Sequence, residues 1–215
     1  MKLSWIKTSR IIKKIFSKYI WDVPNKEHKI YLTFDDGPTP EITDWTLNQL
    51  NQYNAKATFF CIGDNIKKHP EIFQRVVENN HAIGNHTFNH LNGWKTSNDV
   101  YIKNVESCAV ELNHNCQLST VNCQLFRPPY GKIKLSQSRK LRKLGYKIIM
   151  WDVLSEDYDT TVSKEKCLQN VLENIESGSI IVFHDSVKAF PNLEYTLPKV
   201  LKIGSEKGFV FDAIK

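Results

Sequence analysis

The stretch KIYLTFDDGP, Lys29–Pro38, decides the predicted fold. Its first part, Lys29–Phe34, is a largely apolar run with the length of a β-strand. Two adjacent carboxylates, Asp35 and Asp36, follow directly, and a Gly-Pro pair then breaks the strand. A strand that is apolar on both faces is typical of a parallel sheet covered by helices. We therefore expect a buried parallel strand that carries two acidic side chains at its carboxyl end.

The same unit recurs along the chain, because further apolar runs of strand length alternate with segments of helical periodicity. The expected strands are Lys29–Phe34, Ala57–Ile62, Ala82–His86, Gln124–Arg127, Lys147–Val153, Ser179–His184 and Phe209–Ile214. The expected helices are Glu41–Tyr53, Pro70–Asn79, Asn98–Leu112, Leu135–Leu144, Val162–Ile175 and Leu193–Ile203.

This alternation indicates an α/β fold built from βα units around a parallel sheet. An open doubly wound sheet and a closed barrel both fit the rhythm. Neither GxGxxG nor GxxxxGK[ST] follows an expected strand, so the sequence gives no support to a nucleotide-binding site.

Size and composition indicate one globular domain. The chain has 215 residues, of which 41% are hydrophobic and 24% are charged, and this is enough for a sizeable core. The formal net charge is +6, but the positive side chains are scattered and not interleaved with aromatic ones, so no nucleic-acid partner is expected. We expect a monomer whose main domain covers residues 25–215, preceded by a lead-in over residues 1–24.

The first twenty residues are basic and amphipathic. They contain six Lys or Arg side chains and no acidic one, and Trp5, Ile12, Phe16 and Tyr19 fall close to one helical face. Basic residues interrupt any signal-peptide core and no small-residue cleavage site follows, so we expect a location in the cytoplasm or at the inner face of a membrane. The segment fits either an amphipathic helix on an anionic membrane or a helix docked on the domain.

The five cysteines suggest no metal or disulfide framework. Their number is odd and no CxxC pair occurs, which argues against a cysteine zinc site and against a disulfide scaffold. Cys61 lies in an apolar run and is interpreted as a core residue. Cys116 and Cys123 could pair if oxidised, although the rest of the chain has the pattern of a reduced protein.

Polar side chains interrupt the apolar pattern where the expected strands end. In parallel α/β folds, catalytic groups gather at the carboxyl ends of the strands, so five segments are expected to converge on one rim. These segments contain Asp35 and Asp36, His86 and His90, Arg127–Gly131, Asp152 and Asp157, and His184 and Asp185.

A metal site is the chemistry that two of these segments suggest. His86 and His90 are four residues apart, and on a helical turn such side chains lie on the same side. With a carboxylate they form a His₂Asp set that leaves room for water, as in catalytic zinc sites. Two adjacent aspartates after a buried strand are costly unless they are paired or metal-bound, although one of them could cap the following helix.

The remaining rim residues have two interpretations each. His184 is either a core histidine or a general acid or base, and other titratable groups at the same rim favour the second. Arg127 is either a surface side chain or a hydrogen-bond donor that orients a carboxylate. We assign no role to the other histidines, which are His28, His69, His81 and His114.

With these residues in place, the chain resembles the polysaccharide deacetylases of the NodB-homology type, carbohydrate esterase family 4. The resemblance covers about Ile30 to Ile214. Its three most specific motifs are Thr33–Pro38 (TFDDGP), His86–His90 (HTFNH) and Arg127–Gly131 (RPPYG). Two looser ones are Asp157-Tyr158, in place of Asp-Trp, and Val182-Phe183-His184, in place of Leu-x-His.

The resemblance implies a distorted (β/α) barrel with about seven parallel strands in a single domain that follows the basic N-terminal helix. It also implies that Asp36, His86 and His90 bind a divalent metal, usually zinc, with cobalt, nickel or manganese as alternatives. The implied partner is an acetylated glycan.

The family's other roles carry over residue by residue. Asp35 would be the general base, tethered by Arg127, and His184 would be the general acid, oriented by Asp157. The backbone N–H of Tyr130 would point at the oxyanion. Four residues would contact the substrate: Pro129, Tyr130, Tyr158 and Val182.

Two departures from the family pattern affect the expected pocket wall, because Tyr158 replaces a tryptophan and Val182 replaces a leucine. In the second motif Thr87 replaces a serine, which is a mild change. The expected activity is N-deacetylation of N-acetylglucosamine-type residues in chitooligosaccharide, peptidoglycan or a cell-envelope precursor. Alternatives are an O-acetyl polysaccharide esterase of the same family, a non-catalytic carbohydrate-binding domain, and a two-metal phosphoesterase.

Overall fold

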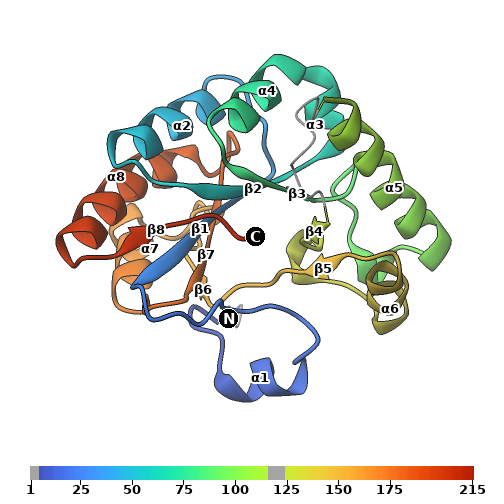
Figure 1. Cartoon of the computed structure of the whole chain (residues 1–215), viewed down its shortest axis with the longest axis horizontal. Helices are drawn as coiled ribbons and strands as arrows, with labels where there is room; N and C mark the ends of the chain where they lie inside the picture. Colours follow the sequence, from blue (N-terminus) through green and yellow to red (C-terminus); the bar gives the residue numbers. More distant parts are fainter. Residues whose placement is uncertain (1–4, 116–123) are drawn as a thin grey trace.

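The computed structural model describes residues 5–115 and 124–215, so Cys116 and Cys123 lie outside the described residues. Figure 1 shows a barrel of short strands with helices on its outer side. The strands are β1 (Lys29–Asp35), β2 (Ala57–Cys61), β3 (Ala82–Asn85), β4 (Leu125–Phe126), β5 (Lys147–Ile148), β6 (Val153–Leu154), β7 (Ile180–His184) and β8 (Val210–Phe211). The helices are α1 (Arg10–Ile15), α2 (Ile42–Gln52), α3 (Gly63–Lys68), α4 (Pro70–Glu78), α5 (Asn98–Asn115), α6 (Leu135–Lys143), α7 (Lys164–Leu172) and α8 (Phe190–Glu206).

The sheet confirms the expected distorted barrel of about seven parallel strands. Its order is β5-β4-β3-β2-β1-β7-β6, with β8 paired to β1, and every pairing between these strands is parallel. Strand β1 lies inside the sheet between β2 and β7, and its Phe34 stacks on Phe59 and Phe183 with ring centroids 5.0 and 6.0 Å apart. Helices cover the outer faces of these strands (Figure 1), and the strands contribute apolar side chains to two separate buried clusters, which explains why they are apolar on both sides.

The prediction of a single strand over Lys147–Val153 is wrong, because this segment contributes to two strands on opposite edges of the sheet. Its first part, β5, pairs with β4, and the part that follows, β6, pairs with β7. Between them the backbone changes partners: Met150 N–H donates to Ile20 and Asp152 N–H donates to Ile180. One continuous stretch of chain therefore joins the two edges of the barrel.

This change of partners also corrects the position of Asp152. The side chain was expected on the catalytic rim, at the end of a strand. It instead precedes β6 and is buried at the amino end of the sheet, where its carboxylate accepts from Ser179 Oγ at 2.6 Å. Asp152 therefore takes no part in the candidate site.

The N-terminal segment docks against the joint between β5 and β6. Lys7 Nζ lies 2.6 Å from Asp152 Oδ2, and Lys13 forms ion pairs with both Asp152 and Asp22. Isolated β-bridges join Lys7 to Val153 and Ile20 to Ile149. The helix itself, α1, is shorter than the predicted stretch of residues 1–20 and lies outside the barrel wall (Figure 1). No helix in residues 5–115 and 124–215 combines the length and apolarity needed to cross a bilayer.

Most predicted helices are confirmed, and α3 is the one that was missed. The ranges of α2, α4, α5 and α6 agree with the predicted ones to within a few residues. The missed helix, α3, has the sequence GDNIKK, in which Ile66 is the one large apolar side chain, so no apolar stripe marks it. Its position after β2 matters, because Asn65 on this helix contacts the candidate site.

Candidate active site

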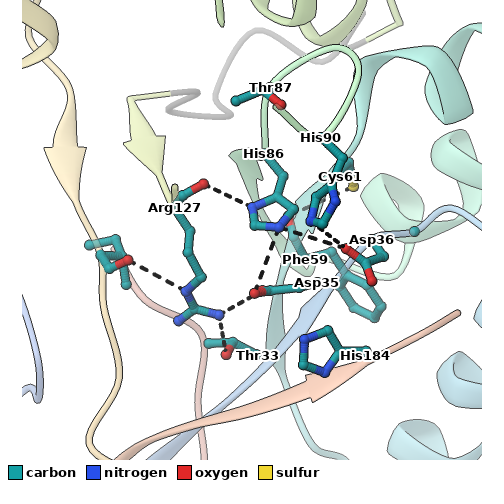
Figure 2. A network of polar contacts seen from close by, with 12 residues as sticks. Thr33, Asp35, Asp36, Phe59, Cys61, His86, Thr87, His90, Arg127 and His184 are labelled. Atoms are coloured by element: carbon teal, nitrogen blue, oxygen red, sulfur yellow. Dashed lines mark hydrogen bonds and ion pairs between the residues drawn. The ribbon is translucent and has the colours of Figure 1, made fainter. Parts of the chain in front are cut away.

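The predicted catalytic residues meet at the carboxyl ends of the strands (Figure 2). Asp35 is the last residue of β1 and lies in register with His184, the last residue of β7. His86 directly follows β3, and Arg127 directly follows β4. Four strands that are separated in the sequence therefore bring these side chains to one rim, as the parallel arrangement predicts.

Asp36, His86 and His90 form a group that could hold a metal ion. One ligand atom from each lies within 4.8 Å of the others, and they are the one such group of three among residues 5–115 and 124–215. Asp36 Oδ1 lies 3.3 Å from His90 Nε2 and 3.7 Å from His86 Nε2 (Figure 2). This carboxylate oxygen is buried and has no hydrogen-bond partner in the described structure, a costly arrangement that a bound cation would relieve.

The tautomer of His86 agrees with metal binding. Its Nδ1 lies 2.8 Å from the carbonyl oxygen of Arg127, an acceptor, so Nδ1 carries the proton. Nε2 therefore presents a lone pair towards Asp36, and a cation bound between these two acceptors would stabilise the arrangement. Burial lowers the pKa of His86 to about 4 and also lowers the pKa of His90, so both imidazoles are neutral at pH 7 and available as ligands.

The predicted helical turn between His86 and His90 is wrong, although the two rings do meet. Thr87 and His90 adopt left-handed φ angles of 65° and 55°, and the segment is a loop. The ring centroids are nevertheless 5.1 Å apart. Side chains hold the loop: Asn85 Oδ1 accepts from Thr87 N–H, and Asn104 Oδ1 accepts from the N–H groups of Phe88 and Asn89.

Arg127 is a buried partner of Asp35, not a surface side chain. Its Nη1 donates to Asp35 Oδ1 at 2.7 Å and to Thr33 Oγ1 at 2.7 Å, while Nη2 donates to the carbonyl of Met150. Burial alone would raise the pKa of Asp35, but Arg127, through its charge and its hydrogen bond, outweighs burial together with His86 and His184, and the net pKa is lowered. Asp35 is therefore ionised, with one oxygen fixed by the guanidinium.

Removal of this guanidinium is expected to destabilise the fold. Arg127→Met leaves a buried carboxylate without its partner, which typically costs about 3–5 kcal/mol of the free energy of unfolding. Chemical denaturation followed by circular dichroism would measure the change. Arg139→Met, at an exposed position on α6, is the matched control and should change stability by less than about 0.5 kcal/mol. Equal stability of the two variants would contradict the role of the buried pair.

His184 and Asp157 form the second charged pair of the rim. His184 Nδ1 donates to Asp157 Oδ1 at 2.8 Å, and the backbone N–H of His184 donates to Oδ2 at 2.8 Å. Ser155 Oγ also donates to Asp157, which is completely buried. Burial alone would lower the pKa of His184, but Asp157, with smaller contributions from Asp36 and Asp35, outweighs burial and raises the pKa to about 9. The imidazolium is thus the stable form at neutral pH, as a proton donor requires.

The predicted substrate-contacting residues lie near these pairs and differ in how exposed their side chains are. The Tyr130 ring packs on His90 with centroids 4.5 Å apart and is 59% exposed, whereas Pro129 is buried. Tyr158 meets His184 edge-on at 5.0 Å. Val182 lies two residues before His184 on β7, so both side chains point to the same face of the strand, but Val182 is buried.

Two residues that were given no role in the sequence hold the turn that carries Asp36. Asp185 is completely buried and accepts from Gly37 N–H at 3.0 Å and from Thr43 Oγ1 at 2.6 Å. A Cβ at Gly37 would lie 2.0 Å from Asp185 Oδ2, which explains the glycine. Asn65 Nδ2 donates to the Asp36 carbonyl at 2.7 Å. The signal for Asp185 was its place directly after His184, whereas Asn65 had no such signal because α3 was not predicted.

A pocket borders the metal group, and an exposed tryptophan follows His90 in the sequence. A pocket of about 360 Å³ has Asp36 and His90 on its wall, a size in the usual range for small-molecule sites. Trp94, four residues after His90, is 61% exposed, and its Nε1–H donates to the Ile133 carbonyl at 3.1 Å. Its ring is therefore fixed and exposed, a feature that sequence reasoning missed.

Comparison with known families agrees with the motifs. The sequence pattern of the family described as polysaccharide deacetylase matches residues 22–149. A peptidoglycan-N-acetylglucosamine deacetylase of Bacillus cereus is 32% identical over 192 residues, which cover 89% of this chain and 88% of the relative. A chitooligosaccharide deacetylase of Azorhizobium caulinodans is 34% identical over 163 residues, which cover 76% of each chain.

A solved structure shares nearly the whole fold. The crystal structure of the Bc1960 peptidoglycan N-acetylglucosamine deacetylase, in complex with a substituted benzamide, superposes with a TM-score of 0.86 at 31% identity. The superposition covers 96% of this chain and 95% of that one. On the family match, the identity and the shared fold together, this chain belongs to the polysaccharide deacetylase family.

Proposed function

We propose that this protein is a metal-dependent N-deacetylase that acts on N-acetylglucosamine-type residues of a glycan. The observation that supports it best is the presence on one rim of three elements. The first is the candidate metal-binding group of Asp36, His86 and His90. The second is the carboxylate of Asp35, which the buried Arg127 fixes, and the third is the imidazolium of His184, which the buried Asp157 fixes. The names of the relatives, which act on peptidoglycan and chitooligosaccharides, support the glycan as the substrate class.

The residues divide the reaction between them. A divalent ion held by Asp36, His86 and His90, zinc in this proposal, would polarise the acetyl carbonyl and acidify the attacking water. Asp35, held ionised by Arg127, accepts the proton of that water. The backbone N–H of Tyr130 donates to the developing oxyanion, a type of contact worth roughly 3–4 kcal/mol in comparable sites. His184 donates its proton to the departing amine, so acetate and a free amino sugar result.

Substrate contacts are assigned to the side chains around these groups. Tyr130 offers an exposed ring that packs on His90, and the exposed ring of Trp94, four residues after His90 in the sequence, is assigned to the sugar as well. Pro129, Tyr158 and Val182 are assigned to the wall around the acetyl methyl group. Tyr158 contacts His184 directly, and so a phenol takes the place that an indole would occupy in the family pattern.

The alternatives differ in what they require. A two-metal phosphoesterase needs a second group of ligands, and the described residues contain the single group above. A non-catalytic carbohydrate-binding domain would need neither the Asp35–Arg127 pair nor the His184–Asp157 pair. An O-acetyl esterase uses the same residues, and only its substrate separates it from the proposed activity.

A substrate panel tests the proposed activity. Zinc-loaded protein should release acetate from N-acetylated chitooligosaccharides or peptidoglycan fragments and produce an equal amount of free amine. Lipid-linked N-acetylated sugars and O-acetylated xylan complete the panel. Release of acetate from xylan alone would favour the esterase, and tight glycan binding without acetate release would favour the binding domain.

The pair His184–Asp157 predicts a shift in the pH profile of this activity. His184 must be protonated to act as an acid, so its contribution is present below its pKa and is lost as the pH rises through that value. Asp157→Asn removes the negative charge that raises the pKa of His184. The alkaline loss of kcat/KM should therefore move to lower pH in this variant, and activity at neutral pH should fall.

The control for this measurement is Asp99→Asn, which removes an exposed carboxylate on α5 and should leave the profile unchanged. If Asp157→Asn kept the alkaline limb of the native protein, that limb would belong to a group other than His184.

A further inference from the structure

The exposed side of the N-terminal segment carries large apolar side chains that nothing in the described structure covers. Trp5, Ile11, Ile15 and Phe16 are 50%, 71%, 65% and 37% exposed. We call these four, together with the exposed cations Arg10, Lys14 and Lys18, the N-terminal patch. Single exposed apolar residues are ordinary, but four within twelve residues of chain mark an interaction surface.

The patch belongs to a fixed part of the molecule. Lys7 and Lys13 anchor its segment to Asp152, whose side chain is 1% exposed. Phe16 stacks on Tyr19 with ring centroids 5.9 Å apart, and its carbonyl accepts from Trp21 Nε1–H. The apolar side chains of the patch are therefore held in place on the protein surface and point away from it.

The basic residues of this segment divide into two sets. Lys7 and Lys13 face the barrel and are neutralised by acidic partners. Arg10, Lys14 and Lys18 face solvent and form no ion pair with any described residue, and no acidic residue occurs before Asp22. On α1 the pairs Arg10/Lys14 and Ile11/Ile15 each have a spacing of four residues, so a row of cations lies beside a row of isoleucines.

We propose that the N-terminal patch docks on the surface of an anionic lipid bilayer. Apolar side chains flanked by Lys and Arg, with no acidic group, match a membrane interface, where the apolar atoms enter the headgroup boundary and the cations meet anionic lipids. Trp5 suits this position because the indole combines a large apolar ring with one N–H donor. The positive charge of the patch and its exposed apolar side chains thus favour an anionic bilayer as its partner.

Docking at the patch leaves the candidate active site open. Asp152 and Ser179 precede β6 and β7, so the anchor of the segment lies at the amino ends of the strands. The catalytic rim lies at the carboxyl ends, and α1 lies outside the barrel wall (Figure 1). Bilayer binding should therefore leave acetate release from a soluble chitooligosaccharide unchanged. This inference is independent of the proposed function, because its main readout is binding.

The test is co-sedimentation of the full chain with vesicles. The protein should bind vesicles of equimolar phosphatidylglycerol and phosphatidylcholine, should bind vesicles of phosphatidylcholine much more weakly, and should be released by salt. The variant Arg10→Gln/Lys14→Gln/Lys18→Gln should bind on the order of 100-fold more weakly, because each cation near an anionic surface contributes about fivefold. Ile11→Ser/Ile15→Ser should lose at least about tenfold at low salt as well.

Matched controls change comparable residues elsewhere on the surface. Lys67→Gln/Lys103→Gln/Arg139→Gln removes the same number and kind of exposed cations, and Val100→Ser/Val110→Ser removes two exposed apolar side chains of α5. Both should bind the anionic vesicles within about twofold of the native chain, apart from the small general effect of net charge.

Three results would overturn the proposal. The first is equal binding to both vesicle types, and the second is an equal loss of vesicle binding in the patch and control variants. The third is self-association of the native chain that the isoleucine variant abolishes, because the patch would then be a contact between two copies of the chain. Circular dichroism and acetate release from a soluble substrate confirm that each variant is folded.

Discussion

Asp35→Asn is expected to abolish deacetylation and to leave metal binding nearly intact. The amide has the shape of the carboxylate but cannot accept the proton of the attacking water. Asp35 is also not one of the three grouped ligands, and its Oδ1 is already taken by Arg127. Loss of a general base typically lowers the rate on the order of 10²- to 10⁴-fold.

Two measurements separate this effect from a loss of metal. Acetate release gives kcat, and elemental analysis after dialysis gives the zinc content, which should remain close to that of the native protein. The neighbouring variant Asp36→Asn is the informative comparison, because it removes a proposed ligand and should lose zinc as well as activity. Full activity of Asp35→Asn would disprove the base assignment.

His86→Ala is expected to lose the metal itself. The imidazole is buried, and its Nδ1–H donates to the Arg127 carbonyl, so its Nε2 is held towards Asp36. Changes in residues that only orient a metal ligand typically cost 10- to 100-fold in affinity, and removal of a ligand should exceed about 100-fold. Zinc content and competition with a chromogenic chelator would measure the loss.

The control for this variant is His114→Ala, which removes an exposed histidine on α5. It should keep the zinc content and the activity of the native chain. If His86→Ala retained zinc at the native level, the group Asp36, His86 and His90 would not be the metal site.

Much of the fold could be predicted from the sequence, because most strands are apolar runs of characteristic length. Apolar runs of strand length identify β1, β2, β3 and β7, and the helices between them follow from their spacing. The rim followed as well, because parallel strands place their carboxyl ends together. For this reason the positions of Asp35, His86, Arg127 and His184 along the chain were enough to group them.

The parts that sequence reasoning missed depend on long-range backbone contacts. The stretch Lys147–Val153 has the pattern of one strand, and only the competition between β4, the N-terminal segment and β7 for its hydrogen bonds divides it. For the same reason Asp152, which was predicted on the catalytic rim, lies at the opposite end of the sheet. The spacing of His86 and His90 suggested a helical turn, but Asn85 and Asn104 stabilise a loop that brings the rings together by another route.

The sequence of the N-terminal segment fitted both a helix on an anionic membrane and a helix docked on the domain, and the structure shows why the two were hard to separate. Its lysines are close in sequence, yet they divide between a buried carboxylate and solvent. Composition cannot reveal this division, since the partner Asp152 lies more than a hundred residues away. Docking on the domain is therefore compatible with an exposed face that meets a membrane.

The most direct test of the proposed function is a metal titration of deacetylation. Protein stripped with a chelator should release no acetate from an N-acetylated chitooligosaccharide. Added zinc should restore acetate and free amine in equal amounts, in proportion to the zinc bound, and the rise should end at one ion per chain. Undiminished release of acetate by the stripped protein, or no release at full zinc loading from any N-acetylated glycan, would contradict a metal-dependent N-deacetylase.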